Sequence, residues 1–111
     1  MPRVAVLGAG AWGTAIAGVL ASRLEVSLWA RDFAQAQAMA QTRRNERYLP
    51  GVEIPNAVLV TARLEEALAR RELVLAATPV AALREVLQAL PPSTPLVWLC
   101  KGFEESSGAL P

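Results

Sequence analysis

The sequence predicts an α/β domain, in which a parallel sheet is covered by helices on both faces. Three observations support this fold class. Short apolar runs alternate with stretches of helical periodicity, an order that produces right-handed crossovers and a parallel sheet. The apolar runs are nearly continuous, as is typical of strands that are buried on both faces. The 111 residues, of which 53% are apolar, also suit one compact domain, because domains commonly have roughly 100–150 residues.

The first half of the chain is expected to hold two strands and two helices. Residues 4–7 form a buried strand, and a helical pattern follows them. Residues 25–30 form the second strand, because they combine β-branched and aromatic side chains. Asp32 can then cap a helix over residues 33–43. Residues 44–56 contain two prolines and a glycine, so we expect a loop there.

The second half adds three strands and two helices. Residues 58–60 form the third strand, and Thr61 is expected to cap a helix that extends to residue 69. Residues 73–77 form the fourth strand. The next helix has one apolar face and ends at a pair of prolines. Residues 96–100 then form the fifth strand.

Composition and charge exclude several classes of function. The net charge is +1 without a basic stripe, so nucleic acid is not an expected partner. The absence of histidine excludes imidazole chemistry, and Cys100, the single cysteine, excludes an internal disulfide and a multi-cysteine zinc site. No apolar run approaches the ~20 residues of a membrane span, and we expect no signal peptide, because the N-terminus leads directly into the first strand. We therefore expect a cytoplasmic domain without a metal site.

A glycine-rich motif lies between the first strand and the helix that follows it. Residues 8–13 fit the G-x-G-x-x-G pattern of dinucleotide-binding sites. In that pattern Gly8 makes a tight turn, Gly10 lets the backbone approach a pyrophosphate, and Gly13 lets the helix pack closely on the strand. The helix N-terminus would supply N–H groups to the anion. The motif therefore predicts a Rossmann-type doubly wound parallel sheet and a dinucleotide site, and a glycine-rich turn without a ligand is the weaker alternative.

The end of the second strand indicates which dinucleotide is preferred. Sites that prefer NAD usually carry Asp or Glu there, which binds the ribose 2′-OH. In this chain the strand ends in Ala30 and is followed by Arg31, which can meet a 2′-phosphate. Asp32 is the competing carboxylate, but a helix cap is its simpler role. The sequence therefore favours NADP, with NAD or the use of both cofactors as the alternative.

Four segments occur in the order seen in one enzyme family. They are GAGAWGTA at residues 8–15, LWARD at 28–32, NERYLPG at 45–51 and KGFE at 101–104. Together they resemble the N-terminal, cofactor-binding part of the bacterial NAD(P)-dependent glycerol-3-phosphate dehydrogenases, over nearly the whole chain. Known members of that family reduce dihydroxyacetone phosphate to sn-glycerol 3-phosphate with NADPH or NADH, at the start of phospholipid synthesis. The resemblance implies that this chain is part of such an oxidoreductase.

The resemblance also implies roles for individual residues. Trp12, Arg31 and Tyr48 would contact the nucleotide. Lys101 would lie beside the nicotinamide and the phosphorylated triose substrate, where its ammonium could attract the substrate phosphate or polarise the carbonyl as hydride arrives. Its place just after the fifth strand suits this role independently, because ligands bind at the carboxyl ends of strands in open α/β sheets. An ordinary solvated lysine is the alternative.

The chain departs from the family pattern in three places. Ala11 stands where many relatives carry Ser or Thr, so only its backbone N–H remains to bind a phosphate. Val80 follows Pro79 where a serine is common, which weakens a polar contact. The family also has a second, helical domain that supplies another lysine, the expected proton donor, and most of the substrate phosphate site. We therefore expect residues 1–111 to be the N-terminal NAD(P)-binding domain, with the C-terminal helical substrate domain absent from this chain.

Three functional hypotheses follow. The first is the cofactor half of a glycerol-3-phosphate dehydrogenase, which binds nucleotide but needs the second domain for turnover. The second is the same half of a related reductase, of the ketopantoate or 6-phosphogluconate type, against which the segments at residues 48–51 and 101–102 argue. The third is a stand-alone dinucleotide-binding domain without chemistry. Apolar surface near the fifth strand is expected to favour self-association, for example as a homodimer.

Overall fold

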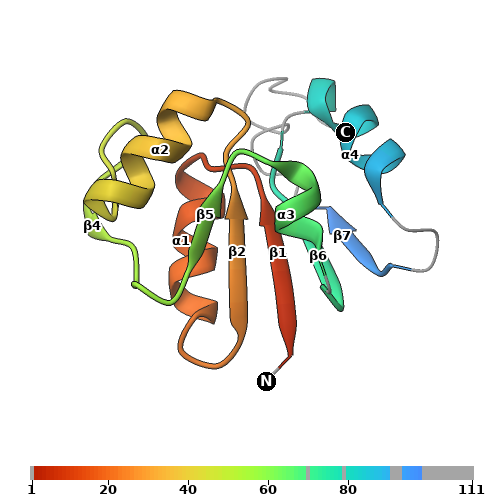
Figure 1. The fold of residues 1–111 in the computed structure, drawn as a ribbon, viewed down its shortest axis with the longest axis horizontal. Helices are drawn as coiled ribbons and strands as arrows, with labels where there is room; N and C mark the ends of the chain where they lie inside the picture. Colours follow the sequence, from red (N-terminus) through yellow and green to blue (C-terminus); the bar gives the residue numbers. More distant parts are fainter. Residues whose placement is uncertain (1, 70, 79, 91–93, 99–111) are drawn as a thin grey trace, which may run out of the picture.

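The computed structural model describes residues 2–69, 71–78, 80–90 and 94–98, and its strands alternate with helices along the chain (Figure 1). The elements are β1 (Arg3–Leu7), α1 (Ala11–Leu20), β2 (Glu25–Trp29), α2 (Phe33–Thr42), β3 (Arg44–Asn45), β4 (Leu49–Glu53), β5 (Leu59–Thr61), α3 (Leu64–Leu68), β6 (Leu73–Ala76), α4 (Val80–Ala89) and β7 (Leu96–Trp98). None of the helices formed by these described residues is long and apolar enough to cross a membrane.

Five of the described strands form one parallel sheet in the order β5-β2-β1-β6-β7. Its central strand, β1, pairs with β2 on one side and with β6 on the other, so that Val6 lies between Leu28 and Leu75. The chain first builds outward from β1 to β5 and then returns to place β6 on the opposite side of β1. The strand order therefore reverses between β1 and β6, and the predicted doubly wound α/β fold is confirmed.

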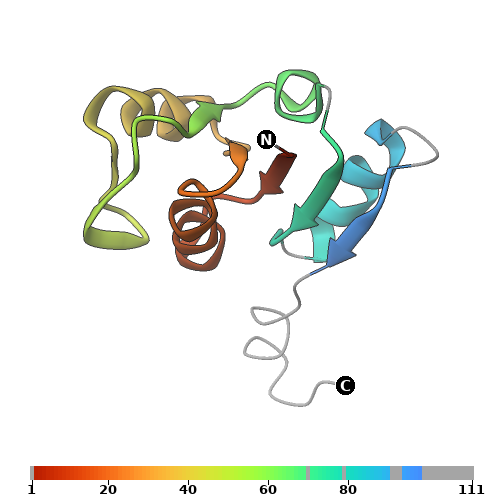
Figure 2. The same ribbon diagram turned by 90° about the horizontal axis from the view of Figure 1, so that it is seen from below.

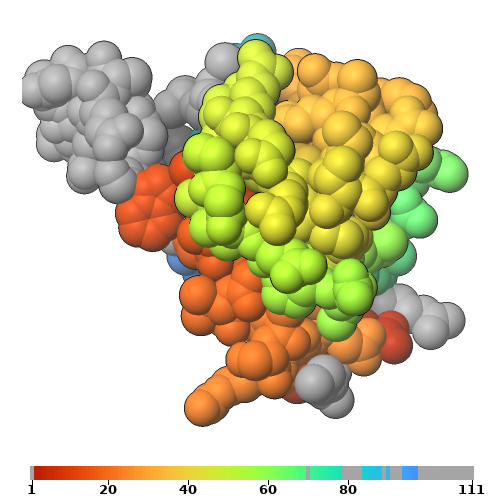
Figure 3. Space-filling model, turned by 90° about the vertical axis from the view of Figure 1, so that its left-hand side faces the viewer, coloured from red at the N-terminus to blue at the C-terminus, as the bar shows by residue number. Residues whose placement is uncertain are grey.

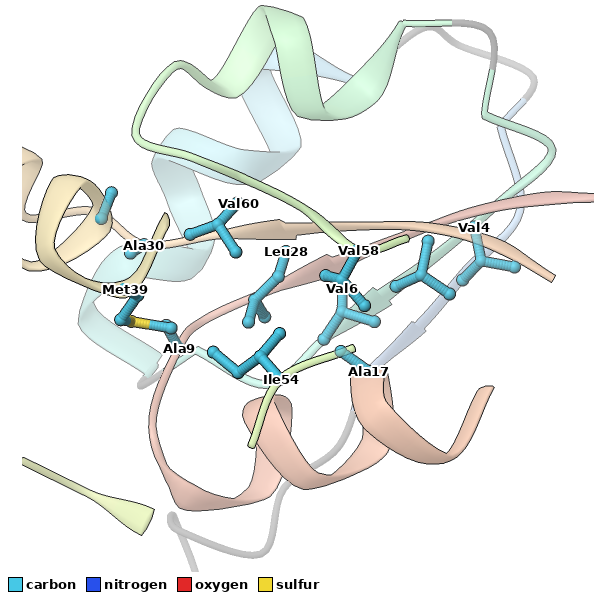
Figure 4. Packing of buried hydrophobic residues seen from close by; sticks show 12 residues of the cluster. Val4, Val6, Ala9, Ala17, Leu28, Ala30, Met39, Ile54, Val58 and Val60 are labelled. Atoms are coloured by element: carbon cyan, nitrogen blue, oxygen red, sulfur yellow. The ribbon is translucent and has the colours of Figure 1, made fainter. Parts of the chain in front are cut away.

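The two faces of the sheet bury separate apolar clusters. Val4 and Val6 of β1 pack with residues of α1 and α2, as Figure 4 shows for Ala17 and Met39. The alternate residues of β1 belong to the second cluster, which includes side chains of α3 and α4. Figure 2 shows α1 on one side of the sheet and α3 on the other. This alternation is the period-two pattern of a strand that is covered on both faces.

The expectation of a plain loop over residues 44–56 was wrong in part. Strands β3 and β4 pair antiparallel within it, with Arg44 opposite Glu53 and Asn45 opposite Leu49. The register shifts between these two pairs, and Gly51, in the stretch of β4 between their partners, adopts a φ of +84°, in the left-handed region that glycine tolerates. The prolines that predicted a loop lie in or just after β4, whose residues are mostly exposed. An exposed two-stranded hairpin tolerates proline because one edge of each strand needs no hydrogen-bonded partner.

Thr61 does not cap the third helix, contrary to expectation. It is the last residue of β5, and α3 begins only at Leu64, with Arg63 as the residue before it. The Thr61 hydroxyl instead accepts a hydrogen bond from the Arg63 N–H at 3.0 Å and donates one to the Glu66 carboxylate. This side-chain turn takes the chain from the strand into the helix, and α3 ends at Leu68, one residue earlier than expected.

The fold also fixes the segment that follows α2. Asp32 caps the start of α2, as predicted, by accepting hydrogen bonds from the N–H groups of Ala34 and Gln35. At the other end Arg43 adopts a left-handed conformation, with φ 58°, and its guanidinium donates to the carbonyl oxygens of Pro55 and Val58 at 2.6 Å each. One charged side chain thereby ties the end of α2 to the connection that leads into β5.

Candidate functional site

The glycine-rich loop between β1 and α1 lies at the carboxyl edge of the sheet. The Gly8 N–H donates to the carbonyl oxygen of Trp29, at the end of β2 (2.9 Å). On the opposite side, the Ala77 N–H donates to the carbonyl oxygen of Leu7 (2.7 Å). The loop is therefore held between the ends of β2 and β6, at the position where the strand order reverses.

The three glycines of the motif differ in their surroundings as the pattern predicts. Gly8 has a φ of +111°, and a Cβ on it would lie 2.7 Å from the Ala77 carbonyl oxygen. A Cβ on Gly13 would overlap the carbonyl oxygen of Gly8. A Cβ on Gly10 would meet no atom of the described residues within 4 Å. The first glycine thus makes a turn in which other residues would be strained, the third allows the helix to pack, and the second leaves open space.

The N-terminus of α1 is suited to an anion. Gly10 precedes the helix and provides no side-chain cap, and the first bond within the helix runs from the Thr14 N–H to the Gly10 carbonyl at 3.0 Å. The N–H groups ahead of Thr14 have no carbonyl acceptor in the helix itself. Ala11 and Trp12 are exposed at this end, Trp12 to 47%. A negatively charged group would meet backbone donors and the positive end of the helix dipole here.

A buried asparagine in the β3–β4 hairpin forms hydrogen bonds with the glycine-rich loop. The side chain of Asn45, in β3, is 1% exposed, and its Nδ2 donates to the Ala9 carbonyl oxygen and to the Thr14 hydroxyl, both at 2.8 Å. The Gln35 Nε2 of α2 donates to the same Ala9 oxygen at 3.2 Å. Figure 3 shows the resulting surface, in which the yellow-green hairpin lies beside the orange helix α1 and against α2.

Sequence reasoning gave Asn45 no role of its own. Asparagine is common in turns, so nothing in the local pattern separates a buried, bridging asparagine from one at an exposed loop tip. The composition of the segment around Asn45 is the signal that could have indicated its role. Residues 43–47 are all charged or amide residues, so the segment has no apolar side chain to bury before Tyr48. One of them has to face inward when the segment packs on α1.

Two of the remaining predicted residues, Arg31 and Tyr48, lie around the same edge. Arg31 follows β2, is exposed, and forms an ion pair with Glu85 of α4, with 3.3 Å between Nη2 and Oε1. Tyr48 is 44% exposed, its backbone N–H donates to Asn45 Oδ1 at 3.4 Å, and the guanidinium of Arg47 lies 5.1 Å from its ring centre. Lys101 lies outside the described residues. The structure thus gathers the glycine loop, Arg31 and Tyr48 at one edge of the sheet.

Comparisons with known proteins agree with one family. Residues 3–111 match the sequence model described as "NAD-dependent glycerol-3-phosphate dehydrogenase N-terminus". The glycerol-3-phosphate dehydrogenases [NAD(P)+] of Variovorax paradoxus and Aromatoleum aromaticum are 55% and 48% identical over 96% and 98% of this chain, which covers 32% and 34% of them. The crystal structure of the Coxiella burnetii glycerol-3-phosphate dehydrogenase superposes with a TM-score of 0.80 at 32% identity, over 91% of this chain and 34% of that one. The chain therefore spans about a third of the length of the relatives it matches.

Proposed function

The chain belongs to the family of NAD-dependent glycerol-3-phosphate dehydrogenases, and we propose that it is the NAD(P)-binding domain of an enzyme that reduces dihydroxyacetone phosphate to sn-glycerol 3-phosphate. The observation that carries the proposal is the N-terminus of α1, which has no side-chain cap and follows Gly10 where the strand order reverses. Sheets of this kind bind dinucleotides there, with the pyrophosphate against the helix N-terminus. A stand-alone domain or a related reductase is less well supported, because the matched family and the curated relatives are glycerol-3-phosphate dehydrogenases.

The residues at this edge fit the parts of a dinucleotide. The open space beside Gly10 admits a pyrophosphate, and the backbone N–H of Ala11 would bind it there without a side-chain hydroxyl. Trp12 and Tyr48 are each about half-exposed and would line the site around the nucleotide. Arg31 would contact the adenosine ribose or its 2′-phosphate. The bound nicotinamide supplies the hydride for the substrate carbonyl.

Lys101 is the proposed contact to both nicotinamide and substrate. The support for it is its position in the sequence just after β7 and the family resemblance of the segment it begins. An ammonium beside the substrate would attract the phosphate and stabilise negative charge that develops on the carbonyl oxygen.

We propose that a helical second domain supplies the proton donor. A polypeptide of these 111 residues should therefore bind NADPH without oxidising it when dihydroxyacetone phosphate is added. Clear turnover would contradict the proposal that a second domain is required for the reaction.

The test of nucleotide binding is a tryptophan-fluorescence titration with NADPH and, in parallel, with NADH. Trp12 is half-exposed beside the phosphate loop, whereas Trp29 is 2% exposed in the core. Binding is expected to quench Trp12 emission saturably and to sensitise nicotinamide fluorescence. In a Trp12→Phe variant, which keeps Trp29 and Trp98, the quench should be smaller while binding is still detected by equilibrium dialysis. A chain that is folded by circular dichroism and binds neither nucleotide would refute the proposed function.

The proposed preference for NADP depends on Arg31. An exposed guanidinium can form charge-assisted hydrogen bonds with a 2′-phosphate, which NADH lacks. We expect Arg31→Ala to raise the Kd for NADPH about tenfold and to change the Kd for NADH less than about twofold. The same titration measures both values. Equal losses for the two cofactors would mean that Arg31 does not contact the 2′-phosphate.

The ion pair between Arg31 and Glu85 gives a complementary prediction. The Glu85 carboxylate pairs with the same guanidinium that the 2′-phosphate would bind. The carboxylate would also repel that phosphate. Because both side chains are exposed, the effect is small: Glu85→Gln is expected to tighten NADPH binding about threefold and to leave NADH unchanged. Glu65→Gln, which removes an exposed carboxylate from α3 on the same face of the sheet as α4, is the control for net charge and should change neither.

We also propose a cytoplasmic location and a place at the start of phospholipid synthesis, both of which rest on the family resemblance of the sequence rather than on geometry. Self-association is proposed because Leu59 of β5 and Val97 of β7, on the two outermost described strands, are 41% and 46% exposed. Sedimentation velocity measures it, and a monomer over a wide concentration range would contradict it.

A further inference from the structure

The peptide between Ala9 and Gly10, in the glycine-rich loop, has a conformational alternative in which the whole peptide is rotated. Rotating this peptide changes the backbone angles on either side of it, and glycine accepts both signs of φ at little cost. Among the described residues, a Cβ at Gly10 would have no neighbour within 4 Å, so the space beside its Cα is open. In the rotated state the Ala9 oxygen would point where the Gly10 N–H now points. A site for an anion would then present the negative end of a dipole in place of a donor.

The structure restrains this peptide with two side-chain donors. Asn45 Nδ2 and Gln35 Nε2 reach the Ala9 oxygen from β3 and α2, at 2.8 and 3.2 Å. The Asn45 amide is itself fixed, because its second N–H proton is used by the Thr14 hydroxyl and its Oδ1 accepts from the Tyr48 N–H. Reversing the amide would set Oδ1 against the Ala9 oxygen. The Asn45 side chain is 1% exposed, so its hydrogen bonds have little competition from water.

The direction of the Gly10 N–H follows from this restraint. The peptide bonds described are trans, and in a planar trans peptide the C=O and the next N–H point in opposite directions. The Ala9 oxygen faces α2 and the hairpin, so the Gly10 N–H faces away from them. Figure 1 shows α2 and the hairpin on one side of α1, with β6 and α4 on the other. The N–H therefore faces the side on which the strand order reverses.

We propose that Asn45 and Gln35 are positioning residues for the pyrophosphate of the dinucleotide. They hold the Ala9–Gly10 peptide so that the loop and the first turn of α1 present N–H groups, and no carbonyl oxygen, to the anion. The inference rests on the proposed function and deepens it, since it assigns the orientation of the phosphate-binding backbone to a hairpin and a helix that do not themselves carry the glycine motif.

Gln35→Met is the main test because it removes one donor and keeps the length and shape of a helical side chain. Gln37→Met, at an exposed position of the same helix, is the matched control. The probes are ADP, which has the diphosphate, and adenosine, which lacks it, each titrated into the chain and followed by NMR. We expect Gln35→Met to raise the Kd for ADP about fivefold relative to Gln37→Met and to leave the Kd for adenosine unchanged.

A second measurement reports the orientation of the Ala9–Gly10 peptide in the absence of any ligand. In the weakly aligned wild-type chain, the N–H residual dipolar coupling of Gly10 should fit the geometry described above. It should be reduced by averaging in Gln35→Met and preserved in Gln37→Met. Asn45→Leu should have a larger effect of the same kind, although the loss of a buried amide can prevent folding, in which case Gln35→Met decides.

The outcomes separate the two proposals. If Gln35→Met matches Gln37→Met in both the Gly10 coupling and the Kd for ADP, the positioning role is refuted and nucleotide binding stands. If Gln35→Met weakens ADP and adenosine equally, the residue is merely structural, and the positioning role is again refuted. If the wild-type chain is folded and binds neither ADP nor NADH, the proposed function itself fails.

Discussion

Replacing Gly13 with alanine is expected to destabilise the domain by about 3 kcal/mol or more and to abolish nucleotide binding. In most helices the same change would stabilise, because alanine has the better helix propensity by about 1 kcal/mol. Here the new Cβ would overlap the backbone oxygen of Gly8, and backbone cannot move aside as the end of a flexible side chain can. The Gly8 turn is itself confined, since it packs on the backbone of Ala77. Either α1 moves off the sheet or the loop opens.

Gly18→Ala is the matched control, because Gly18 lies in the same helix. A Cβ there would have its closest contact at 3.8 Å from the Cδ of Pro55, which is ordinary van der Waals distance. We expect this variant to be more stable than the wild type by about 0.5–1 kcal/mol. Urea unfolding of the two variants gives the free energies, and an NADPH titration gives the binding. A Gly13→Ala chain as stable as the wild type would show that the close packing of α1 on the loop is not required.

Arg43→Ala is expected to cost about 3 kcal/mol of unfolding free energy, since hydrogen bonds made by a charged group contribute about 1.5–3 kcal/mol each. The two bonds concerned reach Pro55 and Val58, and truncation leaves both carbonyl oxygens without the guanidinium. Arg43 also has a positive φ, which alanine tolerates poorly and glycine well. Arg43→Gly loses the same hydrogen bonds but should be about 1 kcal/mol more stable than Arg43→Ala.

Urea unfolding should therefore give the highest free energy of unfolding for the wild type, a lower one for Arg43→Gly and the lowest for Arg43→Ala. The segment that Arg43 ties down includes Asn45 and Tyr48, so both variants should also weaken NADPH binding while they remain folded. If Arg43→Ala and Arg43→Gly were equally stable, the left-handed conformation at this position would carry no strain. If both matched the wild type, the two guanidinium bonds would contribute nothing.

The features that sequence predicted well are those that neighbouring residues decide. The roles of Gly8, Gly10 and Gly13 follow from a turn of six residues, and the cap at Asp32 reaches only two and three residues along the chain. Strand order was also predictable in outline, because a glycine motif between a strand and a helix belongs to one kind of sheet.

The features that sequence missed depend on contacts between distant residues. Asn45 reaches Ala9 and Thr14, 36 and 31 residues away, and no local pattern announces such a pairing. The hairpin of β3 and β4 was missed because its prolines and glycine predict a turn. They do not indicate whether the residues on either side of the turn form paired strands. The partner of Arg31 lies on α4, across the edge of the sheet, so the sequence could suggest what Arg31 binds but not what it competes with.

The hydrogen bond between Ala77 and Leu7 has a consequence for biosynthesis. The two residues are 70 positions apart, so at roughly 5–20 residues per second a ribosome makes the second one about 4–14 s after the first. Until β6 arrives, the Gly8 turn lacks the backbone against which it is packed. A nucleotide in the cell can therefore stabilise only nascent chains that have already added this late strand, because a ligand shifts the folding equilibrium only toward the state that binds it. The cofactor thus acts late in the assembly of this sheet, once β6 has been added, and cannot guide the earlier steps.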